Sequence, residues 1–342
     1  MRVNWRRRAI VLPVLGGILV GAIVLATAIG SVPLPLGEVV RALASRLTGA
    51  ATGGSSDTII WQIRVPRVLT AAVVGGALST AGAVFQGLLR NPMADPYIIG
   101  TSGGAALGAT IALMVPIQVS LFGFTFVSVA AFAGALGAVL VVYNVARVGP
   151  RTPVTTLLLT GFALSSVLAA IMSFLMFISN NALRRIILWT MGGLSGAGWT
   201  QLAVVIPIVL VALGITYTLA PDLNAFLLGD EQAAALGVHV ERRKLAFLGL
   251  GSWLTAAAVS VSGLVGFVGL VVPHVVRLIM GPDHRLLLPA STLVGGVFLV
   301  LADLLARSLM PPAELPVGII TALVGGPFFI YLLRKARREY SF

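Results

Sequence analysis

Long apolar runs dominate this chain and decide its fold class. One run covers Ala9 to Ile29, another covers Val68 to Leu89, and similar runs recur to the end of the sequence. Each approaches the roughly 20 residues that a helix needs to cross the hydrocarbon core of a bilayer. Only 10% of the 342 residues are charged, whereas a soluble domain carries about 25%. The sequence therefore predicts an all-α polytopic membrane protein that forms a single transmembrane domain over residues 1–342.

Charge sets the orientation of the predicted spans, of which there are about ten. Most of the 23 Lys and Arg residues fall in alternate polar intervals, including both ends of the chain. The positive-inside rule assigns these intervals to the cytoplasm. Both termini are therefore predicted to be cytoplasmic, as a short segment over residues 1–8 and a tail over residues 334–342. The first apolar run is longer than the roughly 7–15 residues of a signal-peptide core, which favours an uncleaved first helix.

The net charge of +12 does not indicate a nucleic-acid partner. The arginines cluster at the ends of apolar runs, as they do in membrane proteins whose loops face the cytoplasm. Membrane lipid is the expected surface partner, and no nucleic acid is expected.

The stretch from Arg64 to Gly108 is the most informative part of the chain. Its apolar run ends at the segment Asn91–Pro96, where two prolines remove backbone donors and interrupt the helix. Helix formation then resumes in a glycine-rich run whose small residues recur every four positions and predict close helix packing. These packing positions are Gly100, Gly104 and Gly108. A tightly packed helix pair with a polar turn suits a translocation path better than a simple anchor.

Three arginines fall at the outer ends of predicted spans: Arg64, Arg67 and Arg307. Arg64 and Arg67 share one helix face, and the orientation places Arg307 on the same side of the membrane. Lipid headgroups are enough to explain any one of them, but together they form a patch suited to carboxylates of an external partner. Asp303 precedes Arg307 by four residues, which predicts an i,i+4 pair in preference to a proton relay.

Two polar intervals are long enough to hold structure of their own. On the outer side, the helical spacing of apolar residues predicts a short amphipathic helix over Leu36–Leu47, and Gly53–Ser56 is expected to form a flexible loop tip. On the inner side, Asp222–Gly237 is rich in alanine and leucine with a glycine at each break. This pattern predicts two short helices.

Signatures of catalysis are missing from the sequence. No glycine-rich loop precedes either of the two lysines, as a P-loop would require, so any ATP hydrolysis belongs to another chain. His239, His274 and His284 lack metal-ligand spacing, and His274 is expected to be a hydrogen-bonded residue at a helix start. No cofactor is therefore expected on this chain.

Several long motifs, in order, resemble the permease subunits of type II ABC importers for iron-siderophores, haem and cobalamin, the FecCD/BtuC-like family. The motifs are RVPR from Arg64, GAVFQGLLRNPMADPYIIGTSGGAALG from Gly82, LNAFLLGDEQAAALGV from Leu223, SGLVGFVGLVVPHVVRLIMGPDHRLLLP from Ser262 and ARSLMPPAELPVGIITALVGGPFFIYLL from Ala306. The resemblance implies a ten-helix permease in a bacterial plasma membrane. It also implies a homodimer, two ATPase subunits that bind ATP and Mg²⁺, and an extracytoplasmic substrate-binding protein.

Family roles can be placed on matching residues. Arg64, Arg67 and Arg307 would pair with glutamates of the binding protein. Asn91 and Met93, with Thr155 or Thr156, would lie near a cytoplasmic gate, and the register at the two threonines is open by one residue. The interval over residues 222–243 would contain the coupling helices that dock on the ATPase, through Leu223, Asn224, Leu228, Gly229, Asp230, Glu231, Ala233, Leu236 and Gly237.

Two other classes of function compete with the importer permease. An ion-coupled secondary transporter would need ionisable residues along its path, and these are scarce in the predicted spans. An integral-membrane enzyme would need a polar catalytic cluster, which the sequence does not offer. The cargo stays open among ferric siderophore, haem and cobalamin.

Overall fold

The structure is a computed structural model that describes residues 5–30, 35–47, 55–117, 119–121, 123–179 and 182–339. Within these ranges the chain is helical apart from turns and one two-stranded hairpin, in which β1 (Ser120–Leu121) pairs antiparallel with β2 (Phe124–Thr125). The helices are α1 (Trp5–Ala28), α2 (Leu36–Leu47), α3 (Ser55–Thr58), η1 (Ile59–Arg64), α4 (Val65–Leu88), η2 (Pro96–Ile99), α5 (Thr101–Met114), α6 (Phe126–Ala146), α7 (Val154–Ile178), α8 (Leu183–Thr190), α9 (Trp199–Thr218), α10 (Ala220–Phe226), α11 (Asp230–Ala235), α12 (Val240–Ser262), α13 (Val268–Met280), α14 (His284–Ser308) and α15 (Val317–Glu339).

Seven helical segments among the described residues are long and apolar enough to cross a membrane. Three shorter apolar helices accompany them, over Thr101–Met114, Val268–Met280 and Val317–Leu332. The multi-pass helical architecture expected from the apolar runs is therefore confirmed.

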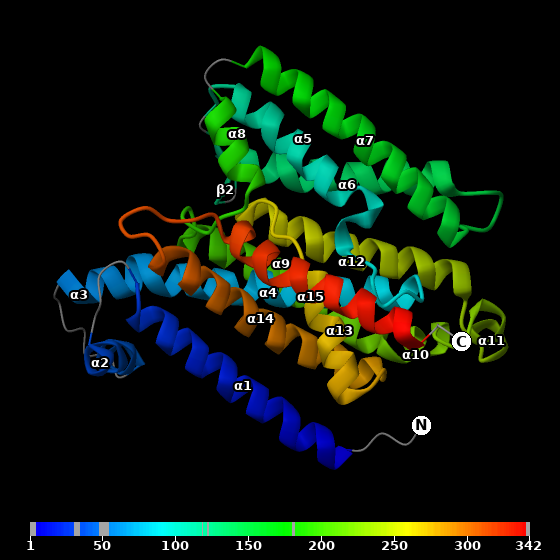
Figure 1. The fold of residues 1–342 in the computed structure, drawn as a ribbon, viewed down its shortest axis with the longest axis horizontal. Coiled ribbons are helices and arrows are strands. Elements are labelled where there is room, and N and C mark those ends of the chain that lie inside the picture. Colours follow the sequence, from blue (N-terminus) through cyan, green and yellow to red (C-terminus); the bar gives the residue numbers. More distant parts are fainter. Residues whose placement is uncertain are drawn as a thin grey trace.

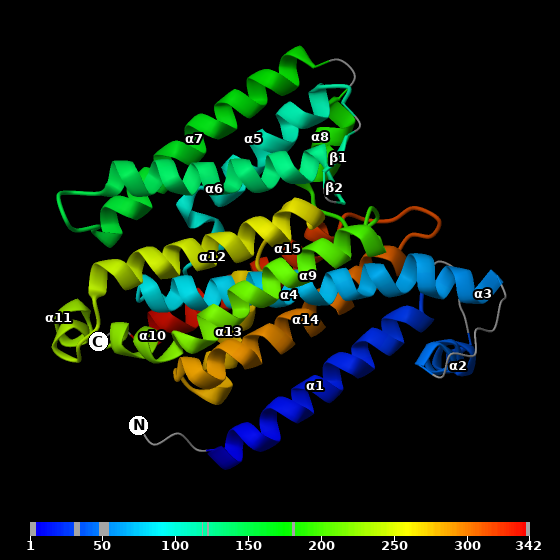
Figure 2. The same ribbon diagram turned by 180° about the vertical axis from the view of Figure 1, so that it is seen from behind.

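Helix α4 is the centre of the fold. It packs against α1, α9, α12, α13 and α14, which surround it in both views of the ribbon (Figures 1 and 2). This close packing depends on small residues: a Cβ at Gly75 would overlap the Gly295 carbonyl of α14, and a Cβ at Gly82 would overlap the Gly269 carbonyl of α13. Because glycine has no side chain, the helix backbones can approach closely. In lipid, apolar helices associate largely through such van der Waals packing.

A second group of helices, α5 to α8, lies to one side of the central bundle (Figure 1). Helix α12 joins the two groups, because it packs against α4 and α9 on one side and against α5 and α6 on the other. Helix α7 forms the outer edge and leaves large apolar side chains exposed, among them Phe162 and Phe177. Such a surface suits hydrocarbon or another membrane chain better than water.

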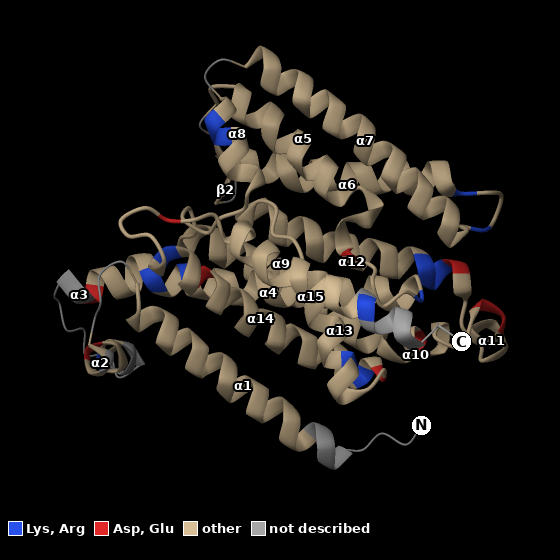
Figure 3. Cartoon of the chain, in the orientation of Figure 1, with Lys and Arg blue, Asp and Glu red and all other residues tan. Residues whose placement is uncertain are grey.

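Charged residues gather at the two ends of the molecule and leave its middle apolar (Figure 3). One end, here called the α3 end, carries α3, the start of α4 and the end of α14. The opposite α11 end carries α10, α11 and the start of α12, and α1 begins and α15 finishes towards it (Figure 1). This separation is what a bilayer imposes on a spanning bundle, because charges are costly in its centre.

Several predicted boundaries differ from the structure. The helix expected from Val68 is continuous with η1 and begins the span at Ile59, because Arg64 at its start is buried among other helices. Ser55 lies in α3, so the expected loop tip is wrong there, whereas Gly53 and Gly54 lie outside the described residues. The short amphipathic helix over Leu36–Leu47 is confirmed.

Candidate functional site

The turn between α4 and α5, here called the elbow (residues 89–100), is held by its own polar groups. The backbone N–H of Met93 donates to Asn91 Oδ1 at 2.9 Å, and that of Tyr97 donates to Asp95 Oδ1 at 2.8 Å, which caps η2. Burial raises the pKa of Asp95 to about 6 from its ordinary 3.8, against the lowering effect of the Tyr97 N–H. The elbow is thus an ordered structure with a defined start.

A second interruption, between α12 and α13, meets the elbow. Gly263 and Phe267 both have positive φ there, at 64° and 68°, so the chain turns sharply before α13 begins at Val268. The hydroxyl of Tyr97 donates to the Val265 carbonyl at 3.0 Å and accepts from the Val265 N–H at 3.2 Å. Tyr97 therefore joins the two interrupted helix pairs, a role that its position in a proline-rich turn did not reveal.

The three glycines of the elbow and α5 have two different roles. A Cβ at Gly104 would overlap the Gly134 carbonyl of α6, and one at Gly108 would overlap the Ala130 carbonyl. These two residues let α5 and α6 pack closely. Gly100 differs from the prediction, because it precedes the helix with φ of 84° and meets Ser165 of α7 only at ordinary contact distance. Gly100 serves the turn.

The residues expected at a gate lie on the elbow and at the start of α7. Asn91 is exposed and Met93 is half-buried; on α7, Thr155 is exposed and Thr156 is half-buried. The elbow meets α7 further along the helix, where a Cβ at Gly161 would crowd the Ile98 carbonyl oxygen at 2.6 Å. The contact between elbow and α7 thus depends on Gly161, and the gating roles of the four residues stay a prediction.

His274 does not start a helix, contrary to the expectation. Helix α13 begins six residues earlier and carries Pro273 within it, so His274 lies in the helix interior with its Nδ1 buried. Phe267 has a left-handed backbone conformation, and α13 begins at the next residue, Val268. A proline usually favours a helix start, so the residues around Pro273 gave no indication of this earlier start.

The inner polar interval forms two short helices, α10 and α11, as its composition predicted. Gly229 and Gly237 end them with φ of 108° and 87°, a conformation that favours glycine. Leu223 and Ala233 are fully buried and anchor the pair, whereas the side chains of Leu228 and Leu236 are more than 60% exposed. The charged end of the bundle therefore carries two exposed apolar side chains on a rigid support, and Glu231 of α11 is exposed as well.

Polar side chains fasten α10 to the turn before α14. Asn224 donates from Nδ2 to Asp283 Oδ1 at 2.7 Å, and its Oδ1 accepts from the His284 backbone N–H at 2.8 Å. The same oxygen lies 2.9 Å from His284 Nδ1. Helix α10 therefore cannot move without the start of α14.

Helix α11 is fastened by ion pairs. Asp230 lies 2.6 Å from Lys244 Nζ of α12 and 3.5 Å from the guanidinium of Arg90 in the elbow. Lys244 is nearly buried and also contacts Glu241, which in turn accepts the Thr152 N–H at 3.0 Å just before α7. Sequence analysis missed this network, because its members come from four separated segments.

The three outer arginines do come together, at the α3 end, but as an internal cluster. Arg64 donates to the Thr27 and Ala28 carbonyls at 2.8 and 2.9 Å, and Arg307 donates to the Ala26 carbonyl, so the two cap the end of α1. Both are about 5% exposed. A Cβ on Gly30 would crowd both guanidinium groups, so glycine leaves the space in which they meet.

Arg67 is held by two carboxylates. Its guanidinium pairs with buried Asp303 at 2.9 Å and with partly exposed Glu314 at 2.8 Å. Asp303 also lies 3.3 Å from Arg307, which is the i,i+4 pair that the sequence predicted. Arg67 and Glu314 are thus the members of this cluster nearest to solvent, since the side chain of Glu314 is 38% exposed.

Comparison with known proteins connects these features to one family. Residues 18–335 match the model of the FecCD transport family. The chain belongs to this family. It is 49% identical, over 82% of its length and 74% of the relative's, to the cobalamin import system permease protein BtuC of Halobacterium salinarum. It is 43% identical to the hemin transport system permease protein HmuU of Yersinia pestis, over 82% of this chain and 85% of the relative.

Further relatives extend over almost the whole chain. The Fe(3+) dicitrate transport system permease protein FecD of Escherichia coli is 37% identical over 93% of this chain and 96% of its own length. Among solved structures, an inward-facing metal-chelate-type ABC transporter superposes with a TM-score of 0.81 at 33% identity, covering 95% of this chain and 98% of that one. The family resemblance drawn from the motifs is therefore confirmed.

Proposed function

We propose that this chain is the permease subunit of an ATP-binding-cassette importer that moves a bulky metal chelate into the cytoplasm. The observation that carries the proposal is the pair α10–α11, a rigid short-helix unit with exposed Leu228 and Leu236 at the charged α11 end. Relatives named for cobalamin, hemin and ferric dicitrate transport support the cargo class of ferric siderophore, haem or cobalamin.

The proposed arrangement has ten spans with both termini in the cytoplasm of a bacterial cell. Seven long and three shorter apolar helices of the described residues supply that number. The α11 end would be cytoplasmic, because the start of α12 carries Arg242, Arg243 and Lys244 there. Two copies of the chain would form the path, with exposed α7 as one face available to a second copy.

The proposed partners divide the work. Two ATPase subunits would bind ATP and Mg²⁺ and dock on α10–α11, and this chain would hydrolyse nothing. A substrate-binding protein would dock at the α3 end, where Arg67 could exchange Glu314 for a carboxylate of the incoming protein. An ion-coupled transporter is the weaker candidate, since the buried carboxylate of Asp303 is held by Arg67 and Arg307.

The decisive experiment reconstitutes the permease with its ATPase and binding protein in liposomes. ATP-dependent uptake is followed for labelled haem, a ferric siderophore and cobalamin. Uptake of one cargo, lost in the variant Leu228→Asp but kept in Leu227→Asp as the neighbouring control, is the expected result. Failure of an ATPase to co-purify with the wild-type chain would overturn the proposal.

A further inference from the structure

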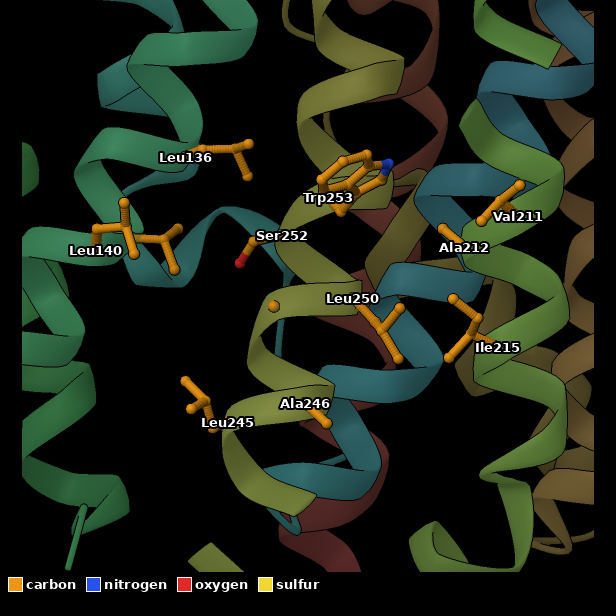
Figure 4. Close-up of a pocket in the computed structure, with 12 residues that line it drawn as sticks. Leu136, Leu140, Val211, Ala212, Ile215, Leu245, Ala246, Leu250, Ser252 and Trp253 are labelled. Carbon is orange, nitrogen blue, oxygen red and sulfur yellow. The ribbon is translucent and has the colours of Figure 1, made fainter. Parts of the chain in front are cut away.

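An apolar groove of about 440 Å³ runs along the outer face of α12 (Figure 4). Helix α12 forms its floor, α6 forms one wall with Leu136 and Leu140, and α9 forms the other with Val211 and Ile215. Trp253 lies at one end of the floor, held edge-on against Phe132 of α6 at a centroid distance of 5.7 Å.

Small residues on the floor create the groove. Gly249 has open space where a Cβ would stand, Ala246 beside it adds little bulk, and so does Ala212 on the α9 wall. The walls and floor are helices long and apolar enough to span a membrane, so the groove lies within the depth of the bilayer. A hydrocarbon chain, and not water, is the medium that can fill it.

A positive charge lies on the floor helix, just before the first residue that lines the groove. Arg242 lies one turn before Leu245 and shares a helix face with Ala246, Gly249 and Trp253 by its spacing. Its side chain is exposed, and no ion pair joins it to another residue that the structure describes. The neighbouring cations differ, because Arg243 pairs with Asp222 and Lys244 with Asp230.

The dimensions match one lipid leaflet. Eleven residues of helix separate Arg242 from Trp253, which is about 16 Å of rise. Half of a bilayer's hydrocarbon core is about 15 Å thick. A phospholipid with its phosphate at Arg242 would therefore lay one acyl chain along the floor and end it near the Trp253 ring. Basic residues at a membrane surface select anionic lipids.

We infer that this groove binds one anionic phospholipid, with the acyl chain between α6 and α9 and the phosphate on Arg242. The proposal does not depend on the cargo or on the ATPase. It assigns a function to the open floor at Gly249 and to the unpaired charge of Arg242, neither of which the transport proposal uses.

Native mass spectrometry of the full chain, purified from membranes containing phosphatidylglycerol and phosphatidylethanolamine, tests the inference. The wild-type chain should retain phosphatidylglycerol. Gly249→Phe, which fills open space, should lower the retained lipid by about tenfold, and Arg242→Gln should reduce the preference for phosphatidylglycerol while some lipid stays bound. Gly137→Phe is the matched control, because Gly137 on α6 also has open space but does not line the groove.

A second measurement keeps the test independent of purification. Phosphatidylglycerol brominated on its acyl chain should quench the fluorescence component that Trp253→Phe removes, and Gly249→Phe should relieve that quenching. Equal lipid retention in Gly249→Phe and wild type would overturn the inference. So would a change of oligomeric state in Gly249→Phe without loss of lipid, since the groove would then be a protein interface.

Discussion

The Nζ of Lys244 in α12 lies 2.6 Å from Asp230 Oδ2 in α11, so a single ion pair joins the second short helix to a long span. Lys244 also contacts Glu241, which accepts the Thr152 N–H before α7. A displacement of α11 would therefore reach α12 and α7 through hydrogen bonds and ion pairs, with no flexible loop between them.

Replacing Lys244 with Met should uncouple the short helices from the spans. The methionine keeps the apolar stem but leaves Asp230 and Glu241 without their shared cation. We expect the ATPase to co-purify as before, because Leu228 and Leu236 are unchanged, while uptake per ATP hydrolysed falls about tenfold, within the usual range of coupling free energies.

The control for this prediction is Arg243→Gln, the adjacent cation. Its pair with Asp222 is partly exposed, with 41% of the arginine side chain accessible, and exposed pairs contribute little. Uptake and ATP hydrolysis should stay in proportion. If Arg243→Gln and Lys244→Met behave alike, the ion pair with Asp230 has no special part in transmission.

Asp303 should be the most sensitive residue of the outer cluster. Its side chain is 1% exposed and pairs with both Arg67 and Arg307. Asp303→Asn leaves buried Arg307 without its carboxylate and leaves Arg67 only Glu314. Removing one partner of a buried ion pair destabilises a protein by about 3–5 kcal/mol. Glu314→Gln removes the other carboxylate from the same arginine at a partly exposed position and should cost at most about 1 kcal/mol. Thermal unfolding in detergent measures both, and equal losses would contradict the account.

Substitutions of Arg67 and Arg64 should have different effects on the association of a binding protein. Arg67 pairs with exposed Glu314, so it is the member that can exchange partners. Arg67→Gln should slow association of the binding protein by about tenfold and weaken its salt dependence. Arg64→Gln should instead loosen α1, because Arg64 donates to the Thr27 and Ala28 carbonyls. Surface plasmon resonance at two salt concentrations measures the association rate for each variant. If association slows equally in both variants, Arg64 also belongs to the docking surface.

Much of the fold was accessible from the sequence, because a bilayer leaves few choices. Runs of about 20 apolar residues can satisfy their backbone only as helices. The apolar runs Phe122–Val145, Thr155–Ile178, Trp199–Leu219 and Leu286–Ala306 predict spans that begin and end close to those of α6, α7, α9 and α14. Glycine spacing indicated the close helix contact at Gly104 but not the left-handed turn at Gly100. Close helix packing and a positive φ both favour glycine, so the sequence alone does not distinguish them.

The networks were not accessible, because they depend on which segments meet in space. Tyr97 and Val265 are separated by 168 residues, and Arg67 and Asp303 by 236. The sequence placed the arginines on one side of the membrane but could not show that α1 offers them free carbonyls at its end. It therefore predicted an exposed patch where the structure has a buried cluster.

Gly104→Ala should disrupt the contact between α5 and α6. The added methyl group would overlap the Gly134 carbonyl, which is backbone and cannot rotate away. Overpacking of this kind costs about 1–3 kcal/mol. Gly137→Ala on the same α6 has open space and should be neutral or slightly stabilising. Thermal unfolding of the two variants side by side is the measurement, and an unchanged melting temperature for Gly104→Ala would mean that the helices can separate freely.

Asp95 should make the stability of the elbow depend on pH. Burial raises its pKa to about 6 in the folded chain from an ordinary value of 3.8. The folded state therefore disfavours the carboxylate, and the stability of the wild-type chain should fall as the pH rises from 3.8 through about 6. Asp95→Asn keeps an oxygen for the Tyr97 N–H but carries no charge. Above pH 6 it should be more stable than the wild type by up to about 3 kcal/mol.

The pH profile distinguishes this effect from a change in packing. The advantage of Asp95→Asn should shrink as the pH falls below about 6 and vanish only below about 3.8, where the wild-type carboxyl group is protonated in both the folded and the unfolded chain. Asp95→Ala also removes the charge but leaves the Tyr97 N–H without its acceptor, so it should be less stable than Asp95→Asn by about 1 kcal/mol at every pH. Melting temperatures of the three chains between pH 4 and about 8 provide the measurement. A gain in Asp95→Asn that is the same across this range would show that the charge of Asp95 is not its cause.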